Sequence, residues 1–568
     1  MYNPVKVTDV TLRDGLEDFV LRHLRLDDLG RLVGLLDRAG FYSLDCWGGS
    51  TFYAALFDLK EDPWERLKKM RRALTRTPIQ VILRGRMLVG FKPYQDEVVR
   101  RFITRAAHLG ADIFRIYDNL NDLDNMATAI NTAKELRKQV EATVLFSLNP
   151  HVTMDDYLEL ASGLVNLGAD VICLNDSFGV MTPHQVETLI STCRRYFHQP
   201  LRLHLHNNHQ AALTSYQAGI GQGAALVDTT LAALSWSYGP PPVESLMFSL
   251  GGSSHDPHID LDVLGEVTEY LDHLKEKYHY REPAPRKIDD HLGPDYLPGP
   301  LKEFIREELI RRDARDRQRV AYKEAPLVWR DLGYPVLKGR ILEIVGLQAV
   351  ENILSARRYE KIIPIMYDLI RGKFGRLHSP ILLELQSRAL AGDDLAVIPS
   401  AREGSLRTRA GLEREEDILT YSLFPEEAEA FFYVRADVAK PPAAPAPPAP
   451  VAPAPGPYPL FAALTTSLLT LSHKGEEVWA RLDGVGALRK GKQVLFINIQ
   501  DHIEEIEVQL VPGAGDQPDY LVTFHGDTYR VRINKTFPKE QEYTPVVLEI
   551  NGQMEEFLIK NPAGDKSA

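Results

Sequence analysis

The chain has 568 residues, too many for one hydrophobic core, so we expect roughly three or four domains. Hydrophobic residues make up 44% of the sequence and charged residues 25%, which is ordinary for a soluble globular protein. The formal net charge is −12 and no basic stretch offsets it, so nucleic acids and anionic membranes are excluded as expected partners.

The three cysteines, Cys46, Cys173 and Cys193, show neither a metal-ligand spacing nor an even count, which is typical of a reduced compartment. The first ten residues lack the apolar core of a signal peptide, and no apolar run approaches the length of about 18 residues that spans a membrane. We therefore expect a cytoplasmic protein without a transmembrane segment.

Residues 1–255 alternate short apolar runs with amphipathic segments, the pattern of β/α units around a parallel sheet. Leu26–Ala39 is one predicted helix, because Leu29, Leu32, Val33 and Leu36 share one face. The eight predicted strands are Val5–Val10, Ser43–Cys46, Ile79–Leu83, Ile113–Tyr117, Ala142–Ser147, Val171–Leu174, Leu201–His206 and Leu226–Thr230. Eight units predict a closed (β/α)8 TIM barrel of the α/β class.

Polar side chains follow these strands, at the barrel end where functional groups gather. They are Asp14, Arg84, Asp118, Asn175, His204 and His206. A purely structural barrel does not need all of these groups at one rim, so we expect a ligand site there.

The stretch Leu201–Asn208 holds a H-x-H pair, and alternation along a strand places His204 and His206 on one face. With Asp14 they form an O,N,N ligand set suited to Zn2+, Mn2+ or Co2+ acting as a Lewis acid. The alternative is that one histidine is a hydrogen-bonded core residue.

Arg84 is the candidate for binding a small carboxylate, because its planar guanidinium matches two oxygens. The alternative is a salt bridge to Asp118 or Glu17 that only supports the barrel.

Several motifs together resemble the carboxyltransferase domain of biotin-dependent enzymes. They are T-L-R-D-G (11–15), W-G-G-S-T-F (47–52), E-D-P-W-E-R-L (61–67), L-R-G-R-M-L-V-G (83–90), F-R-I-Y-D-N-L-N-D (114–122) and the H-x-H strand. The relatives are the pyruvate carboxylase carboxyltransferase subunit, the oxaloacetate decarboxylase alpha subunit and transcarboxylase. The resemblance covers most of residues 4–435 and implies a helical extension over residues 256–439 that completes the active site and supports a homodimer.

The resemblance implies carboxyl transfer between biotin and pyruvate at a divalent metal held by Asp14, His204, His206 and a carboxylated lysine, with Arg84 on the substrate. Asn175 stands at the lysine position, and an amide cannot form a carbamate. Tyr238 stands where the family has a threonine that shuttles a proton. We count Arg84, Asp118, Asn175 and Tyr238 as the catalytic positions.

The motifs also resemble, over shorter stretches, lyases and aldolases such as hydroxymethylglutaryl-CoA lyase. These enzymes use an aspartate and an H-x-H pair without the carboxylated lysine. Loss of that lysine therefore need not abolish the metal.

Residues 440–459 are about half proline and predict an extended, semi-rigid spacer. Residues 460–568 alternate polar and apolar residues and predict a small, mostly β domain. Arg489–Ile506 aligns with a biotin carrier motif, but Asp501 replaces the lysine that carries biotin, so a degenerate carrier and an unrelated β domain both stay open.

Three functions follow, and we favour the first because Asn175, Tyr238 and Asp501 all depart from the family. The first is a structural or regulatory subunit of a biotin-dependent system for pyruvate or oxaloacetate that has lost the standard reaction. The second is an active carboxyltransferase or decarboxylase using biotin from another chain. The third is a metal-dependent lyase or aldolase without biotin. The first two predict a biotin carboxylase, a biotin carrier or a catalytic paralogue as partner.

Overall fold

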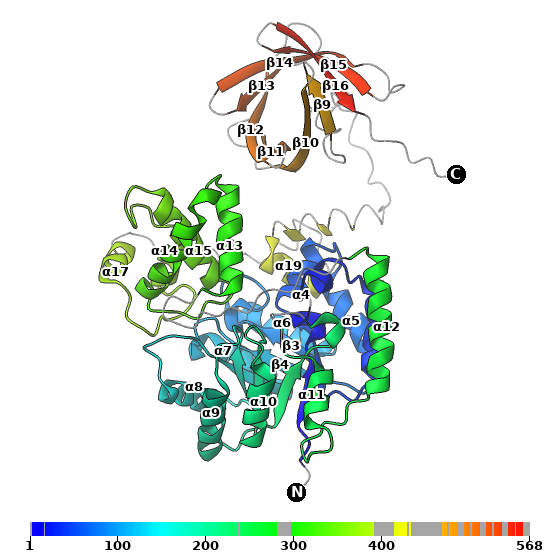
Figure 1. Cartoon of the computed structure of the whole chain (residues 1–568), viewed down its shortest axis with the longest axis vertical. Coiled ribbons are helices and arrows are strands. Elements are labelled where there is room, and N and C mark those ends of the chain that lie inside the picture. The colour runs from blue at the N-terminus through cyan, green and yellow to red at the C-terminus, as the bar shows by residue number, and fades with distance from the viewer. Residues whose placement is uncertain are drawn as a thin grey trace. The chain divides into compact units, whose positions relative to one another are not determined.

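The computed structural model describes residues 3–15, 17–235, 239–280, 297–390 and 414–425, a few residues from 427 to 435, and eight strands between residues 469 and 560. The chain divides into two compact units, Met1–Lys440 and Pro441–Ala568 (Figure 1).

The first unit contains a closed barrel of eight parallel strands in chain order, which confirms the predicted (β/α)8 barrel (Figure 1). The strands are β1 (Lys6–Asp9), β2 (Ser43–Gly48), β3 (Ile79–Leu83), β4 (Ile113–Ile116), β5 (Gln139–Leu145), β6 (Val171–Asp176), β7 (Leu201–Leu205) and β8 (Leu226–Thr229). All eight predicted strands are present. The largest shift is in β5, which starts three residues before the predicted Ala142.

Helices follow the strands and cover the barrel. They are α1 (Thr11–Asp14), α2 (Glu17–Arg22), α3 (Leu26–Leu36), α4 (Ser50–Phe57), α5 (Pro63–Ala73), η1 (Gly85–Met87), α6 (Asp96–His108), α7 (Leu123–Glu135), α8 (Met154–Asn166), α9 (Pro183–Tyr196), α10 (Ala212–Gly221), η2 (Ala232–Leu234), α11 (Val243–Leu250) and α12 (Leu261–Lys277). The predicted stripe of α3 is buried as expected.

Alternation along β7 explains how the barrel is filled. Leu201, Leu203 and Leu205 are buried on one face, and Leu203 packs close to Gly219 of α10 outside the barrel. Arg202 and His204 have the opposite parity and make their hydrogen bonds to residues of β1, β5 and β8, across the barrel interior. The interior is therefore charged, and the apolar core lies between strands and helices.

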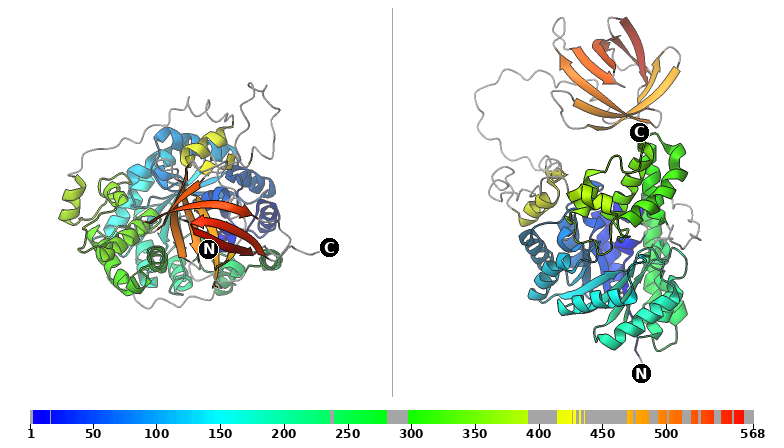
Figure 2. Two further views of the ribbon diagram at one scale, coloured as in Figure 1. Left: turned by 90° about the horizontal axis from the view of Figure 1, so that it is seen from above. Right: turned by 90° about the vertical axis from the view of Figure 1, so that its left-hand side faces the viewer.

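Helices of the extension gather at the end of the barrel away from the N-terminus (Figures 1 and 2). They are α13 (Gly299–Arg311), η3 (Arg315–Arg317), α14 (Gln318–Asp331), α15 (Arg340–Leu354), α16 (Pro364–Ile370) and α17 (Leu383–Leu390). A later helix, α19 (Glu415–Leu423), packs on α6 of the barrel layer. The boundary at residue 255 stays a prediction.

The second unit contains eight antiparallel strands closed into a separate barrel, in keeping with the predicted small β domain. They are β9 (Leu469–His473), β10 (Glu476–Val485), β11 (Gln493–Ile499), β12 (His502–Val511), β13 (Asp519–Phe524), β14 (Asp527–Thr536), β15 (Tyr543–Ile550) and β16 (Gln553–Lys560). Four hairpins have only two residues between their strands, at 474–475, 500–501, 525–526 and 551–552. The predicted spacer, 440–459, lies outside the described residues.

None of the helices in the described part of the chain is both long and apolar enough to cross a membrane.

Candidate metal and substrate site

Asp14, His204 and His206 meet at the mouth of the first barrel. Asp14 Oδ2 lies 3.0 Å from His204 Nε2 and 3.6 Å from His206 Nε2, and the two Nε2 atoms are 3.2 Å apart. Within the described residues, these three offer ligand atoms that all lie within 4.8 Å of one another. We call them the metal trio, since two imidazole nitrogens and a carboxylate oxygen suit a divalent cation.

Local structure places each member of the metal trio. Asp14 ends the short helix α1 directly after β1, His204 lies within β7, and His206 follows the end of that strand. The loop between β6 and α9 packs against His206 at Gly179: a Cβ on Gly179 would lie 2.3 Å from the His206 carbonyl oxygen, at a φ of +60°. Glycine is therefore required there for the His206 backbone to keep its place.

Asp228, inside the barrel, orients the His204 ring. Its Nδ1 lies 2.7 Å from Asp228 Oδ2, and both side chains are buried. The contact of Nδ1 with Asp228 leaves Nε2 facing Asp14 and His206, the orientation in which metal-binding histidines present this nitrogen to an ion.

A buried ionic layer lies under the metal trio. Arg115 and Arg202 both donate to Asp228 and to Glu141, with closest distances between 2.5 and 3.2 Å. Asp45 joins this layer to the mouth, because its Oδ2 pairs with Arg13 at 2.9 Å. Sequence reasoning assigned no role to these residues, although Arg115 lies in the F-R-I-Y-D-N-L-N-D motif and charged residues inside predicted strands were a signal for them.

Burial and neighbouring groups shift the pKa values of Asp14 and His206. Burial opposes ionisation of Asp14, but the Arg13 guanidinium and hydrogen bonds from His204 and His206 outweigh it and hold the Asp14 pKa well below its usual range. Burial lowers the pKa of His206, which favours the neutral imidazole. An anionic carboxylate and a neutral imidazole are the forms that bind metals.

Arg84 makes no ion pair with a carboxylate in the described part of the chain. Its Nε donates to the Tyr117 hydroxyl at 2.9 Å, and its NH1 donates to the carbonyl oxygens of Val89 and Gly90. Phe91 lies against its guanidinium at 5.9 Å. The alternative of a salt bridge to Asp118 is wrong, and the side chain of Glu17, the other alternative partner, lies outside the described residues.

Asp118 organises its own loop. It accepts backbone hydrogen bonds from Leu120 at 2.8 Å and Asp122 at 3.1 Å, and one from Asn125 Nδ2 at 3.0 Å. Burial raises its pKa to about 6. Its described contacts are structural, and its place among the catalytic positions stays a prediction.

Asn175 lies beside His204, since the two are partners in the β6–β7 register. Its Oδ1 accepts from Ser177 Oγ at 2.6 Å, and Ser177 Oγ in turn accepts from Lys338 Nζ at 2.7 Å. Lys338 comes from the segment that leads into α15, so the extension brings a lysine to the barrel mouth. Sequence reasoning missed Lys338, because nothing in the chain order links it to β6.

Two predicted positions have no described geometry. Tyr238 and Asp501 lie outside the described residues.

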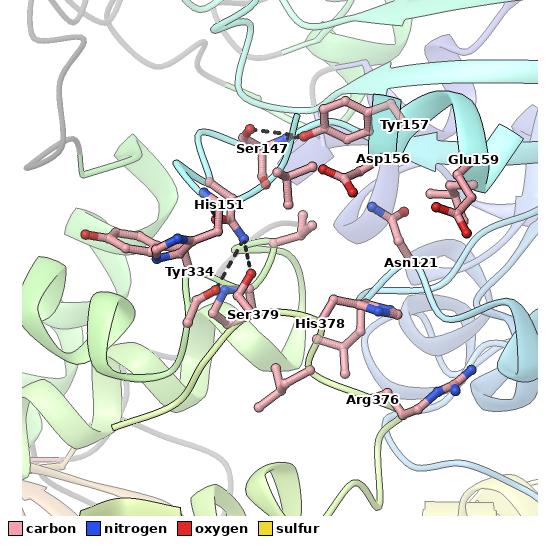
Figure 3. A pocket seen from close by; sticks show the side chains of 18 of the residues that line it. Asn121, Ser147, His151, Asp156, Tyr157, Glu159, Tyr334, Arg376, His378 and Ser379 are labelled. Atoms are coloured by element: carbon pink, nitrogen blue, oxygen red, sulfur yellow. Dashed lines mark hydrogen bonds between the residues drawn. The ribbon is translucent and has the colours of Figure 1, made fainter. Parts of the chain in front are cut away.

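A separate cavity of about 300 Å3 lies between the barrel rim and the extension (Figure 3). Its walls come from the loops after β4 and β5, from the first turns of α8 and from residues 333–336 and 376–379. Asn149 ties the two sides together, because its Nδ2 donates to the Gly333 carbonyl oxygen and to Ser379 Oγ. The metal trio does not line this cavity.

Comparison with known proteins agrees with this architecture. Residues 4–271 match the family model HMGL-like, and residues 305–510 match the model Conserved carboxylase domain. The chain is 34% identical to a pyruvate carboxylase subunit of Methanocaldococcus jannaschii over 438 residues, 75% of this chain and 77% of the relative. It is 30% identical to the 2-oxoglutarate carboxylase large subunit of Hydrogenobacter thermophilus over 584 residues, 99% of this chain and 87% of the relative.

The carboxyl transferase domain of Rhizobium etli pyruvate carboxylase, solved with pyruvate, has a similar fold. Its TM-score is 0.70 at 24% identity, over 89% of this chain and 88% of that domain. The chain therefore belongs to the family of carboxyltransferase domains of biotin-dependent enzymes, to which these pyruvate and 2-oxoglutarate carboxylase subunits also belong.

Proposed function

We propose that this chain is an active carboxyltransferase subunit that exchanges a carboxyl group between biotin and a small 2-oxo acid. The observation that carries the proposal is the metal trio with Arg84 at the same barrel mouth, each held in place by described hydrogen bonds. A barrel mouth that had lost its reaction would not need to keep the metal trio and Arg84 together.

The metal trio fits a divalent cation, Zn2+, Mn2+ or Co2+. Asp14 Oδ2 is buried and has no hydrogen-bond donor in the described residues beyond the facing histidines and Arg13. A cation bound there would polarise the 2-oxo group of the substrate. Arg84 would pair with the carboxylate of that substrate through NH2, while Tyr117 and the carbonyl oxygens of Val89 and Gly90 hold the rest of the guanidinium in place.

Biotin is a substrate of this site and arrives on another chain, since Asp501 offers no amine for attachment. A biotin carboxylase and a biotin carrier are the proposed partners, and a homodimer through the barrel and its extension is the proposed assembly. We place the complex in the cytoplasm.

Asn175 favours a second candidate, a subunit that has lost the reaction and serves assembly or regulation. Its Oδ1 is engaged by Ser177 and is neutral, so it cannot replace an anionic ligand. The lyase or aldolase alternative draws on the HMGL-like match over residues 4–271.

The test is oxaloacetate decarboxylation by the full chain, with and without free biotin. Natural protein is compared with His204→Ala, which removes a ligand, with Asn175→Lys, and with His184→Ala, an exposed histidine at the start of α9, as control. Metal-dependent activity that needs biotin and is lost in His204→Ala supports the carboxyltransferase.

Other outcomes select the rivals. Activity that appears only in Asn175→Lys would establish the silent subunit. Metal-dependent turnover of a 2-oxo acid that ignores biotin would point to the lyase or aldolase.

A further inference from the structure

Two cations at the barrel mouth lack a carboxylate partner among the described residues. Arg84 bonds Tyr117 and two carbonyl oxygens, and Lys338 bonds Ser177 Oγ. Neither forms an ion pair there. A half-buried charge without an opposite charge nearby costs free energy, because it has lost part of its hydration. We therefore expect such a charge in a binding site to pair with an anionic ligand.

Tyr117 brings the two cations into one site. The Lys338 ammonium lies 4.9 Å from the centre of the Tyr117 ring, and Arg84 Nε lies 2.9 Å from the Tyr117 hydroxyl. The two charges also act on each other, since Arg84 is among the groups that lower the Lys338 pKa.

The Lys338 ammonium lies in surroundings that do not neutralise its charge. Burial, together with the charges of Arg13 and Arg84, lowers its pKa to about 8, and the Asp14 charge only partly offsets them. Most of the amine is still protonated at neutral pH.

The charge balance beside the metal trio is shifted toward positive. Asn175 is neutral, and Lys338 brings a positive charge next to it through Ser177. Together with the Arg84 guanidinium, the Lys338 ammonium favours a substrate with more negative charge.

We propose that the substrate is a 2-oxo dicarboxylic acid, with Arg84 and Lys338 each holding one of its two carboxylates. The inference rests on the proposed function and narrows its substrate class. An acid with one carboxylate would leave one of the two half-buried cations unpaired.

The test is calorimetric binding to the metal-loaded full chain, with 2-oxoglutarate and 2-oxovalerate as probes. The two acids share a carbon skeleton and differ only in the terminal carboxylate. We expect 2-oxoglutarate to bind about 10- to 100-fold more tightly, the range of one charge-assisted hydrogen-bonded pair.

Three variants test whether Lys338 causes the preference for 2-oxoglutarate over 2-oxovalerate. Lys338→Met should remove it, and Lys338→Arg should keep most of it because the charge remains. Arg340→Gln is the matched control, since this neighbouring cation already pairs with Glu343 at 2.5 Å. Binding that is as tight for 2-oxovalerate as for 2-oxoglutarate would overturn the inference and leave the carboxyltransferase standing.

A preference that survives in Lys338→Met would also overturn it. Absence of binding by both acids, together with absence of oxaloacetate decarboxylation, would instead remove the proposed function and this inference with it.

Discussion

At the scale of single residues, the metal trio depends on side chains that never touch a ligand. His204 reaches the mouth through Nε2, while its Nδ1 is anchored on Asp228, which is held by two buried arginines. The orientation of one imidazole is thus set by charges below it in the barrel.

We expect about one divalent metal per chain in protein purified without chelator. His204→Ala should lower this content to near zero, because two ligands seldom retain a divalent ion against competing water. Elemental analysis measures the content, with His184→Ala as control. A natural protein that stays empty after incubation with Zn2+ or Mn2+ would show that the two histidines are only structural.

Asp228→Asn should weaken metal binding by about 10- to 100-fold, because the anionic partner of His204 is lost. Stability should also fall by about 3–5 kcal/mol, since Arg115 and Arg202 keep their buried charges without this carboxylate. Competition with a metal-binding dye measures the affinity, and calorimetric melting measures the stability. Glu266→Gln, which breaks the exposed pair with Arg38, is the control and should change neither.

At the scale of elements, α19 closes over the W-G-G-S-T-F and E-D-P-W-E-R-L motifs. Trp64 Nε1 donates to Thr420 Oγ1 at 3.0 Å, and Trp47 packs at 5.3 Å from Trp64. Glu416 of α19 pairs with Arg105 at 2.7 Å and with Lys68 at 3.1 Å. Residues of these motifs therefore form part of the surface on which α19 packs.

Glu416→Gln should lower the melting temperature of the first unit at pH 7, by an amount equivalent to about 1–2 kcal/mol. Burial opposes ionisation of Glu416, but Arg105 and Lys68 outweigh it and lower its pKa to about 2. Because the folded pKa lies below the unfolded value of about 4.3, the stabilisation is present above that pH and is lost as the pH falls toward 2.

The measurement for this ion pair is calorimetric melting across that pH range. The difference between natural protein and Glu416→Gln should shrink with acid. Glu415→Gln, next to it on α19 and paired with Arg101, is more exposed and should have a smaller effect. An equal loss in both variants at every pH would contradict a specific role for the Glu416 cluster.

At the scale of the whole molecule, two barrels of opposite construction share one chain. The parallel barrel needs a crossover helix between successive strands, and the antiparallel barrel uses short hairpins. Each closes its own sheet and leaves no open edge.

Because the chain divides into two compact units, we expect two calorimetric unfolding transitions. A chain truncated after residue 440 should keep one of them at an unchanged temperature and should still bind metal. A shift of several degrees in that transition would show that the second unit stabilises the first.

The chain should never carry biotin at residue 501. An aspartate cannot form the amide bond that a lysine amine makes, so a streptavidin blot of native protein should be blank, with a biotin carrier as positive control. A positive band would move the attachment to another lysine and overturn the alignment of Arg489–Ile506.

The sequence by itself determined the parallel barrel, since eight apolar runs at regular spacing leave few other folds. It also determined the metal trio, because the ends of parallel strands must meet at one rim, and that rule brings Asp14, His204 and His206 together from any distance in the chain. Strand ends shifted by a few residues, as at β5, because pairing with neighbours decides where a strand stops.

Only the tertiary structure decided which charges share a site. Lys338 and Asn175 are connected through Ser177 by docking of the extension on the barrel, a contact without local pattern or period. The partners of Arg115 and Arg202 are likewise set by which residues face inward at one level of the barrel. The alternation of polar and apolar residues predicts which face of a strand or helix a residue lies on. Whether a charge is neutralised depends instead on its distance from other charges across the fold.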